Sequence, residues 1–197
     1  MSDAVPYKPF SDEVFAQMSA ADTYICDTLL TPDAGLEATL TSNAANLLDA
    51  IDVAPNQGKL LYLLAKMNSA VNILEVGTLG GYSAICFAKA LPAGGKLISL
   101  EIDPRSAEIA RGNIKNAGYE EKVEIKVAPA LKSLKKMEEE EGWGKEGKKI
   151  DLVFIDADKE NNARYLEYAV KFAKKGTVII IDNVGRAGLQ IRTLRTQ

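Results

Sequence analysis

The chain has 197 residues, 47% of them hydrophobic and 26% charged, and a formal net charge of −3. This length predicts one domain with a sizeable core, and the slightly acidic balance argues against a nucleic-acid partner, which would require clustered basic charge. Histidine is absent, which excludes histidine-based triads, imidazole acid–base catalysis and histidine–metal sites.

The N-terminal part, residues 1–70, is predicted to be helical. Apolar residues recur at helical spacing from Ser11 until Pro32 interrupts the pattern. A second helix is expected over residues 36–50, and Pro55 is a suitable first residue for a third. These amphipathic helices favour a homodimer, as does the unprotected edge of the sheet that is predicted for the rest of the chain.

Strands and helices alternate from residue 72 onward, through a predicted core over residues 71–184 to a short tail at 185–197. The strands are expected at 72–77, 96–102, 123–128, 150–156 and 177–182, and the helices at 82–90, 104–116, 131–140 and 161–174. This alternation predicts an α/β fold, a doubly wound, mostly parallel sheet with helices on both faces. We expect one domain over residues 1–197.

Three further features of the sequence bear on the cellular compartment of the protein. Cys26 and Cys86 lie in apolar helical contexts, so buried reduced thiols in a cytoplasmic protein are expected rather than a disulfide. No apolar run reaches membrane-spanning length, so no membrane partner is expected. Residues 1–6 lack the basic and apolar regions of a signal peptide.

The most polar stretch of the chain is residues 135–149. A solvated helix end followed by a loop explains it most simply. A docking surface centred on Trp143 is the alternative interpretation.

Two apolar runs end in carboxylates. Asp156 follows the first run and Asp182-Asn183 follows the second, while Lys159 stands three residues beyond Asp156. Ligands of open parallel sheets bind outside the carboxyl ends of the strands, and carboxylate and amide oxygens suit Mg²⁺, Ca²⁺ or Mn²⁺. Taken singly, such residues are more often caps, turn formers or solvated side chains, so the interpretation rests on their combination.

A glycine turn follows the first strand, in the run from Leu74 to Ser83. Leu79 stands two residues after Gly77, so the dinucleotide fingerprint G-x-G-x-x-G fails and E-x-G-x-x-x-G remains. This disfavours a nicotinamide oxidoreductase. Glu101 ends the next strand, where an acid can accept hydrogen bonds from two ribose hydroxyls.

Together these motifs resemble the class I S-adenosylmethionine-dependent methyltransferases, and more narrowly the cation-dependent O-methyltransferases of the caffeoyl-CoA and catechol type. The resemblance spans about residues 53–184, and five motifs in the family's order and spacing make it specific. The residues that carry it are 75–83, Glu101, 128–131, 156–159, Tyr165, Asp182 and Asn183.

The resemblance implies a role for each matching residue. The glycine turn would wrap the methionine part of S-adenosylmethionine, with Ser83 on its carboxylate and Glu101 on the ribose. The implied cofactor contacts are Val53, Glu75, Gly77, Gly81, Ser83, Glu101, Ala130, Asp156, Asp158 and Tyr165. Asp156, Asp182 and Asn183 match the ligands of a divalent cation, foremost Mg²⁺, and Lys159 matches the general base.

The chain also departs from the family's pattern. Ala128 stands where the family usually has glycine, and Asn162 where it often has tyrosine. The family's last helix and two further strands, which help to wall the acceptor site, are expected to be missing. The resemblance implies an O-methyltransferase acting on a catechol-like or phenylpropanoid-like hydroxyl. A non-catalytic cofactor-binding or regulatory homologue is the alternative.

Overall fold

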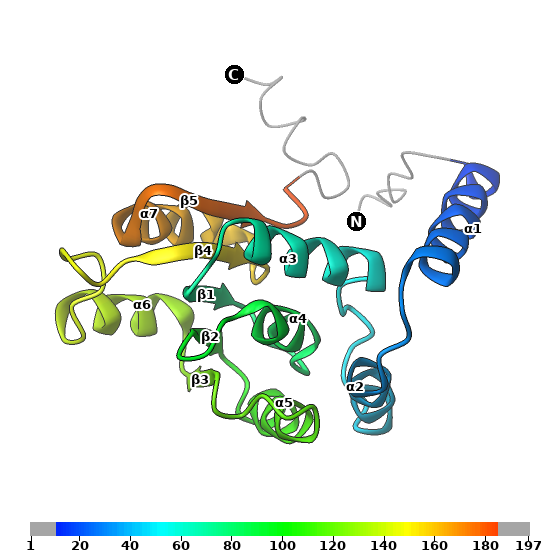
Figure 1. Ribbon diagram of the computed structural model, residues 1–197, viewed down its shortest axis with the longest axis horizontal. Helices are drawn as coiled ribbons and strands as arrows, with labels where there is room; N and C mark the ends of the chain where they lie inside the picture. Colours follow the sequence, from blue (N-terminus) through cyan, green and yellow to red (C-terminus); the bar gives the residue numbers. More distant parts are fainter. Residues whose placement is uncertain (1–10, 185–197) are drawn as a thin grey trace, which may run out of the picture. The chain divides into compact units, whose positions relative to one another are not determined.

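The computed structural model describes residues 11–184 (Figure 1). The chain divides into a large unit, Thr31–Asp182, and a second unit that combines Met1–Leu30 with Asn183–Gln197. The predictions that residues 1–6 are not a signal peptide and that residues 185–197 form a short tail concern residues outside the described range. The same holds for the prediction that the family's last strands are missing. The single domain over residues 1–197 stays a prediction.

In the second unit, α1 (Asp12–Leu29) begins where the sequence predicts it. The Ser11 hydroxyl caps the helix by accepting the Val14 N–H at 3.3 Å. None of its residues is buried. No helix within residues 11–184 is long and apolar enough to cross a membrane.

The large unit is built on a sheet of five parallel strands in the order β3-β2-β1-β4-β5. The strands are β1 (Asn72–Val76), β2 (Lys96–Glu101), β3 (Val123–Val127), β4 (Ile150–Ile155) and β5 (Ala173–Ile181). The order reverses between β1 and β4, which makes the carboxyl ends of these two strands the switch point where ligands bind in such sheets. The predicted fold class is confirmed.

Helices cover both faces of this sheet (Figure 1). Helices α3 (Pro55–Met67), α4 (Tyr82–Ala90) and α5 (Pro104–Asn116) pack on one face, against alternate strand residues such as Ile73 and Leu97. Helices α6 (Ala130–Glu139) and α7 (Asn162–Phe172) cover the other, against the neighbours Leu74 and Ile98. Because successive side chains of a strand point to opposite faces, both layers have apolar cores.

Two element boundaries differ from the prediction by more than two residues. Helix α2 (Ala34–Ala45) ends five residues early, because Leu47 adopts a left-handed conformation (φ 54) and the Leu48 N–H closes on the Asn43 carbonyl. Strand β5 begins at Ala173 rather than at residue 177. A register shift follows its first pair with Ile150, so an irregular, polar stretch is included in the strand.

The alternative interpretation of residues 135–149, a docking surface centred on Trp143, is wrong. The Trp143 side chain is buried, with 8% exposure, in the core beneath α6 and α7. The backbone N–H of Trp143 donates to the Met137 carbonyl at 2.9 Å, which folds the loop back onto the helix end. Lys148 then covers the ring at 4.8 Å from its centre. Both thiols are free, with Cys86 buried and Cys26 partly exposed.

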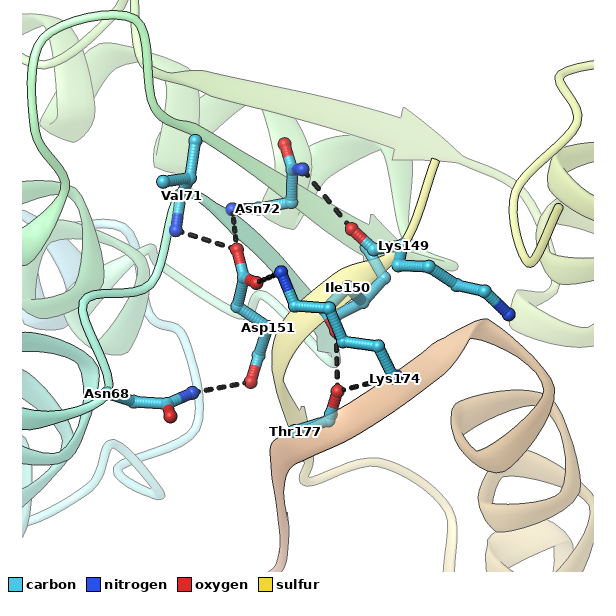
Figure 2. Close-up of polar contacts among 8 residues, drawn as sticks. All are labelled: Asn68, Val71, Asn72, Lys149, Ile150, Asp151, Lys174 and Thr177. Carbon is cyan, nitrogen blue, oxygen red and sulfur yellow. Dashed lines mark hydrogen bonds and ion pairs between the residues drawn. The ribbon is translucent and has the colours of Figure 1, made fainter. Parts of the chain in front are cut away.

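The amino ends of the strands are joined by Asp151 of β4, which is buried (Figure 2). Its Oδ2 accepts the N–H groups of Val71 and Asn72, each at 2.8 Å, and Lys174 pairs with its Oδ1. The Asn68 side-chain amide donates to the Asp151 carbonyl at 2.7 Å. One residue of β4 therefore connects the starts of β1 and β5.

Candidate active site

The glycine turn lies at the switch point, between β1 and α4. Gly77 (φ 102) and Gly81 (φ 88) are in conformations that favour glycine, and Leu79 between them also has a positive φ of 48. A Cβ on Gly77 would overlap the carbonyl oxygen of Asp156, at the end of β4. The turn therefore requires glycine and presses its backbone against the next strand end.

Glu101 holds this turn from the end of β2. Its Oε2 accepts the N–H groups of Thr78 at 3.1 Å and Leu79 at 2.8 Å. Its Oε1 accepts those of Ile102 at 2.8 Å and Asp103 at 2.9 Å. A carboxylate offers about four acceptor sites, so these four backbone donors use all of them.

Glu75 is fully buried under the same turn. It accepts hydrogen bonds from the hydroxyls of Ser83 on α4, at 2.6 Å, and Ser99 on β2, at 2.5 Å. Burial is the main cause that raises its pKa to about 7, and the charges of Asp156 and Glu101 act in the same direction. Ser83, predicted to bind the cofactor's carboxylate, here donates to Glu75.

A second polar cluster follows β4. Lys159 Nζ lies 2.7 Å from Asp156 Oδ1, and both side chains are about four-fifths buried, with 19% and 24% exposure. Asp158 accepts hydrogen bonds from the Tyr165 hydroxyl and the Asn161 amide. Burial by itself raises the pKa of Asp158, but these two donors outweigh it and lower the pKa.

Two of the three predicted metal ligands lie at adjacent strand ends. Asp156 and Asp182 follow neighbouring strands, since the Asp156 N–H donates to Val76 of β1 and the Asp182 N–H to Ile155 of β4, both at 2.9 Å. Asn183 belongs to the second unit, and its own backbone is left-handed (φ 55). Within residues 11–184, three or more histidine, cysteine or acidic side chains nowhere gather as a metal site.

The two remaining predicted contacts flank this edge of the sheet. Ala130 is the first residue of α6, just after β3. Val53 precedes α3 and packs, partly buried, on the core beneath α3, α4 and α5.

Three polar residues of this region were not predicted from the sequence. Ser99 bridges Glu75 and the Thr78 hydroxyl, which lies 2.6 Å from it. Asn43 of α2 and Asn113 of α5 are buried and hydrogen bonded to each other. Two of the three gave a signal, because Ser99 interrupts an apolar strand and Asn113 falls on the buried stripe of its helix, three residues after Ala110.

The switch point therefore carries a glycine turn and an acid on the neighbouring strand, as in α/β proteins that bind a nucleoside-type cofactor, and beside them an acid–lysine pair. Comparison with known proteins identifies the family. The profile described as "O-methyltransferase" matches residues 33–193. The catechol O-methyltransferase of Mycobacterium tuberculosis is 42% identical over 167 residues, covering 85% of this chain and 72% of the relative.

Two further comparisons agree. The catechol O-methyltransferase of Niastella koreensis is 45% identical over 169 residues, or 86% of this chain and 74% of the relative. The solved O-methyltransferase of Bacillus cereus in complex with SAH is 46% identical, with a TM-score of 0.82 over 88% of this chain and 77% of that one. The chain belongs to the O-methyltransferase family and is an S-adenosylmethionine-dependent O-methyltransferase. A non-catalytic homologue is not favoured.

Proposed function

We propose that the protein methylates one hydroxyl of a catechol-like small molecule, which a divalent cation holds in place. The observation that carries this proposal is the Lys159–Asp156 pair beside the glycine turn. Gly77 packs directly on the Asp156 carbonyl, so the proposed general base and the proposed cation ligand adjoin the turn proposed for the cofactor. The names of the catechol-methylating relatives support the choice of acceptor.

The cofactor half of the site rests on the turn and on Glu101. Glu101 would accept the ribose hydroxyls, exchanging some of its four backbone donors for them. The first amides of α4, with Ser83, would face the cofactor's carboxylate, because a helix start attracts negative charge. The other proposed contacts are Val53, Glu75, Gly77, Gly81, Ala130, Asp156, Asp158 and Tyr165.

Asp156 and Asp182 supply carboxylate oxygens on adjacent strand ends, which fits a hard cation such as Mg²⁺, with Mn²⁺ or Ca²⁺ as alternatives. Asn183 is the third ligand predicted from the sequence. When bound, the cation would chelate the acceptor's two oxygens and lower the pKa of the reacting hydroxyl.

Lys159 is the proposed general base. Released from Asp156 and having lost one proton to solvent, its neutral Nζ would take the hydroxyl proton of the acceptor. The acceptor oxygen then bonds to the methyl carbon as the carbon–sulfur bond of the sulfonium breaks, with the bonding electrons left on sulfur. Positioning of the two reactants in line can contribute roughly 7–11 kcal/mol.

The test is methyl transfer from labelled S-adenosylmethionine to a set of catechols, with Mg²⁺ and with EDTA. We expect transfer that EDTA abolishes. Lys159→Ala should lower kcat by about 100-fold or more, as is typical for loss of a general base. Lys89→Ala is the matched control, because Lys89 is also a partly buried lysine paired with an aspartate, Asp33; it should retain turnover.

Two results would count against the proposal. Transfer that is indifferent to EDTA would remove the cation from it. Cofactor binding without transfer to any diol would support the non-catalytic homologue instead.

We further propose that the protein is a cytoplasmic homodimer. Helix α1 carries large apolar side chains that are exposed: Val14, Phe15, Met18, Tyr24, Ile25 and Leu29. Such a face is expected to be covered in an assembly. Sedimentation velocity at micromolar concentration tests this, and a monomer would contradict it.

A further inference from the structure

Two asparagine side chains form a buried pair near the glycine turn. Asn43 of α2 is 3% exposed and Asn113 of α5 is 2% exposed. The Asn113 amide Nδ2 donates to Asn43 Oδ1 at 2.9 Å. Buried amides are costly unless hydrogen bonded, so this pair calls for an explanation beyond packing.

The pair joins two segments of the proposed cofactor site. On one side, Asn113 Nδ2 also donates to the Gly80 carbonyl of the glycine turn at 2.9 Å. On the other, Asn43 Nδ2 donates to Asp52 Oδ1 at 3.0 Å. Asp52 is next to Val53, in the segment 49–54 that leads into α3.

The contact with the turn is close. A Cβ built on Gly80 would overlap the Asn43 side-chain amide, so Gly80 and Asn43 touch without space for a methyl group. Within segment 49–54, the backbone is held locally by a hydrogen bond from the Ile51 N–H to the Asp49 carbonyl. The Asp52 side chain therefore ties this segment to the body of the unit.

The electrostatics of Asp52 agree with this role. Burial raises the pKa of the Asp52 carboxyl, and the hydrogen bond from Asn43 opposes that rise. A partly buried acid is thus held against the unit by a neutral amide rather than by a lysine. The bond is directional, so it sets a position as well as a distance.

We propose that Asn43 and Asn113 are positioning residues that fix segment 49–54 against the glycine turn and so preorganise the cofactor site. The inference rests on the proposed contact of Val53 with the cofactor. Without the pair, binding would have to order the segment, and the cost of that ordering would appear as weaker affinity. Neither asparagine needs to touch a reacting atom.

The test measures the affinity for SAH by calorimetry, together with KM for S-adenosylmethionine and kcat. In Asn43→Ala and Asn113→Ala we expect the Kd for SAH and this KM to rise about tenfold, the equivalent of one lost hydrogen bond, with kcat within about twofold. The double variant should be little worse than either single one, because both break the same connection.

A paired exchange separates positioning from general damage. Asn43→Asp alone places two carboxylates together and should weaken binding at least as much as Asn43→Ala. Combining Asn43→Asp with Asp52→Asn restores a donor and an acceptor in reversed roles at the same net charge, and should recover the affinity to within about threefold. This exchange carries the test even if an alanine variant does not fold.

Asn68→Ala is the matched control, because Asn68 also uses its amide to join distant segments, at the other end of the sheet (Figure 2). It should lower stability with unchanged affinity for SAH. Unchanged affinity in the Asn43 and Asn113 variants would overturn the inference while leaving the proposed function intact. Failure of the unmodified protein to bind SAH would instead overturn the proposed cofactor site, and the inference with it.

Discussion

The two ends of the sheet each contain a buried carboxylate, and the two carboxylates differ in their partners and in the direction of their pKa shifts. At the amino end, Asp151 accepts two backbone amides and pairs with Lys174 (Figure 2). Burial by itself raises the pKa of Asp151, but these partners outweigh it and lower the pKa. At the carboxyl end, Glu75 accepts two serine hydroxyls, and burial raises its pKa to about 7.

The difference separates stability from function. The acid that joins strand starts is compensated by a cation, so its charge supports the fold. Glu75 instead lies near two further acids, Asp156 and Glu101, whose charges disfavour its own. An edge that gathers negative charge is suited to a positively charged ligand, such as the sulfonium of S-adenosylmethionine.

The largest expected effect is at the amino end. Asp151→Ala leaves two backbone amides without their acceptor and Lys174 without its partner, so the free energy of unfolding should fall by about 3–5 kcal/mol. Urea unfolding measures this. Lys174→Ala removes only a largely exposed cation and should cost less than about 1 kcal/mol. Equal losses in the two variants would show that the ion pair, and not the amide bonding, dominates.

The pH dependence of stability tests the carboxyl end. Because folding raises the pKa of Glu75 from 4.5 to about 7, the stability that its protonated form contributes is complete below about pH 4.5 and is lost as the pH rises through about 7. Glu75→Gln removes this titration. As the pH rises from about 5 to about 8, the free energy of unfolding of the variant should rise by about 2–3 kcal/mol relative to that of the unmodified protein. Parallel pH curves of urea unfolding would contradict the buried, titrating acid.

Glu101→Gln probes the acid that holds the turn. Its new amide group would face backbone N–H donors, so the turn loses acceptors and the Kd for SAH should rise about 10–100-fold. Calorimetry checks this. Glu108→Gln changes a glutamate of α5 whose side chain is 82% exposed and pairs with Arg111 at 3.9 Å, and it should leave the Kd unchanged. A Glu101→Gln variant that binds as well as the control would remove Glu101 from the proposed site.

The smallest expected effect is at Ser99, which connects Glu75 to Thr78. Ser99→Ala removes one buried donor and should lower the free energy of unfolding by about 1 kcal/mol. Ser133→Ala, at a buried serine of α6, is the comparison for urea unfolding and SAH binding. If only Ser99→Ala weakens binding, the hydroxyl network supports the turn as well as the core.

Much of the fold could be predicted because strand pattern is local. β1 and β4 are short runs of apolar residues, so their type follows from the chain itself. The start of β5 could not be predicted in the same way, because Ala173 enters the sheet by pairing with Ile150 across a register shift. Contacts between distant residues were also beyond reach, such as that of Asp151 with Val71, 80 residues away.

The site was predictable to a similar extent. The glycine turn and Glu101 come together because the carboxyl ends of parallel strands share an edge, so motif spacing is enough. The spacing of motifs along the sequence does not predict which of several nearby groups a side chain bonds to. Ser83 donates to Glu75, and Lys159 bonds to Asp156, because those groups are nearest in the folded chain.

The contact between Gly80 and Asn43 predicts which second mutation can compensate for a mutation at Gly80. A Gly80→Ala mutation would insert a methyl group where the Asn43 amide lies, so we expect it to damage the protein on its own. A second mutation that shortens residue 43, such as Asn43→Gly, makes room for that methyl group. In a selection for folded protein, the second mutation should therefore arise as an intragenic suppressor of the first, while the weaker affinity for SAH expected without the Asn43 side chain persists.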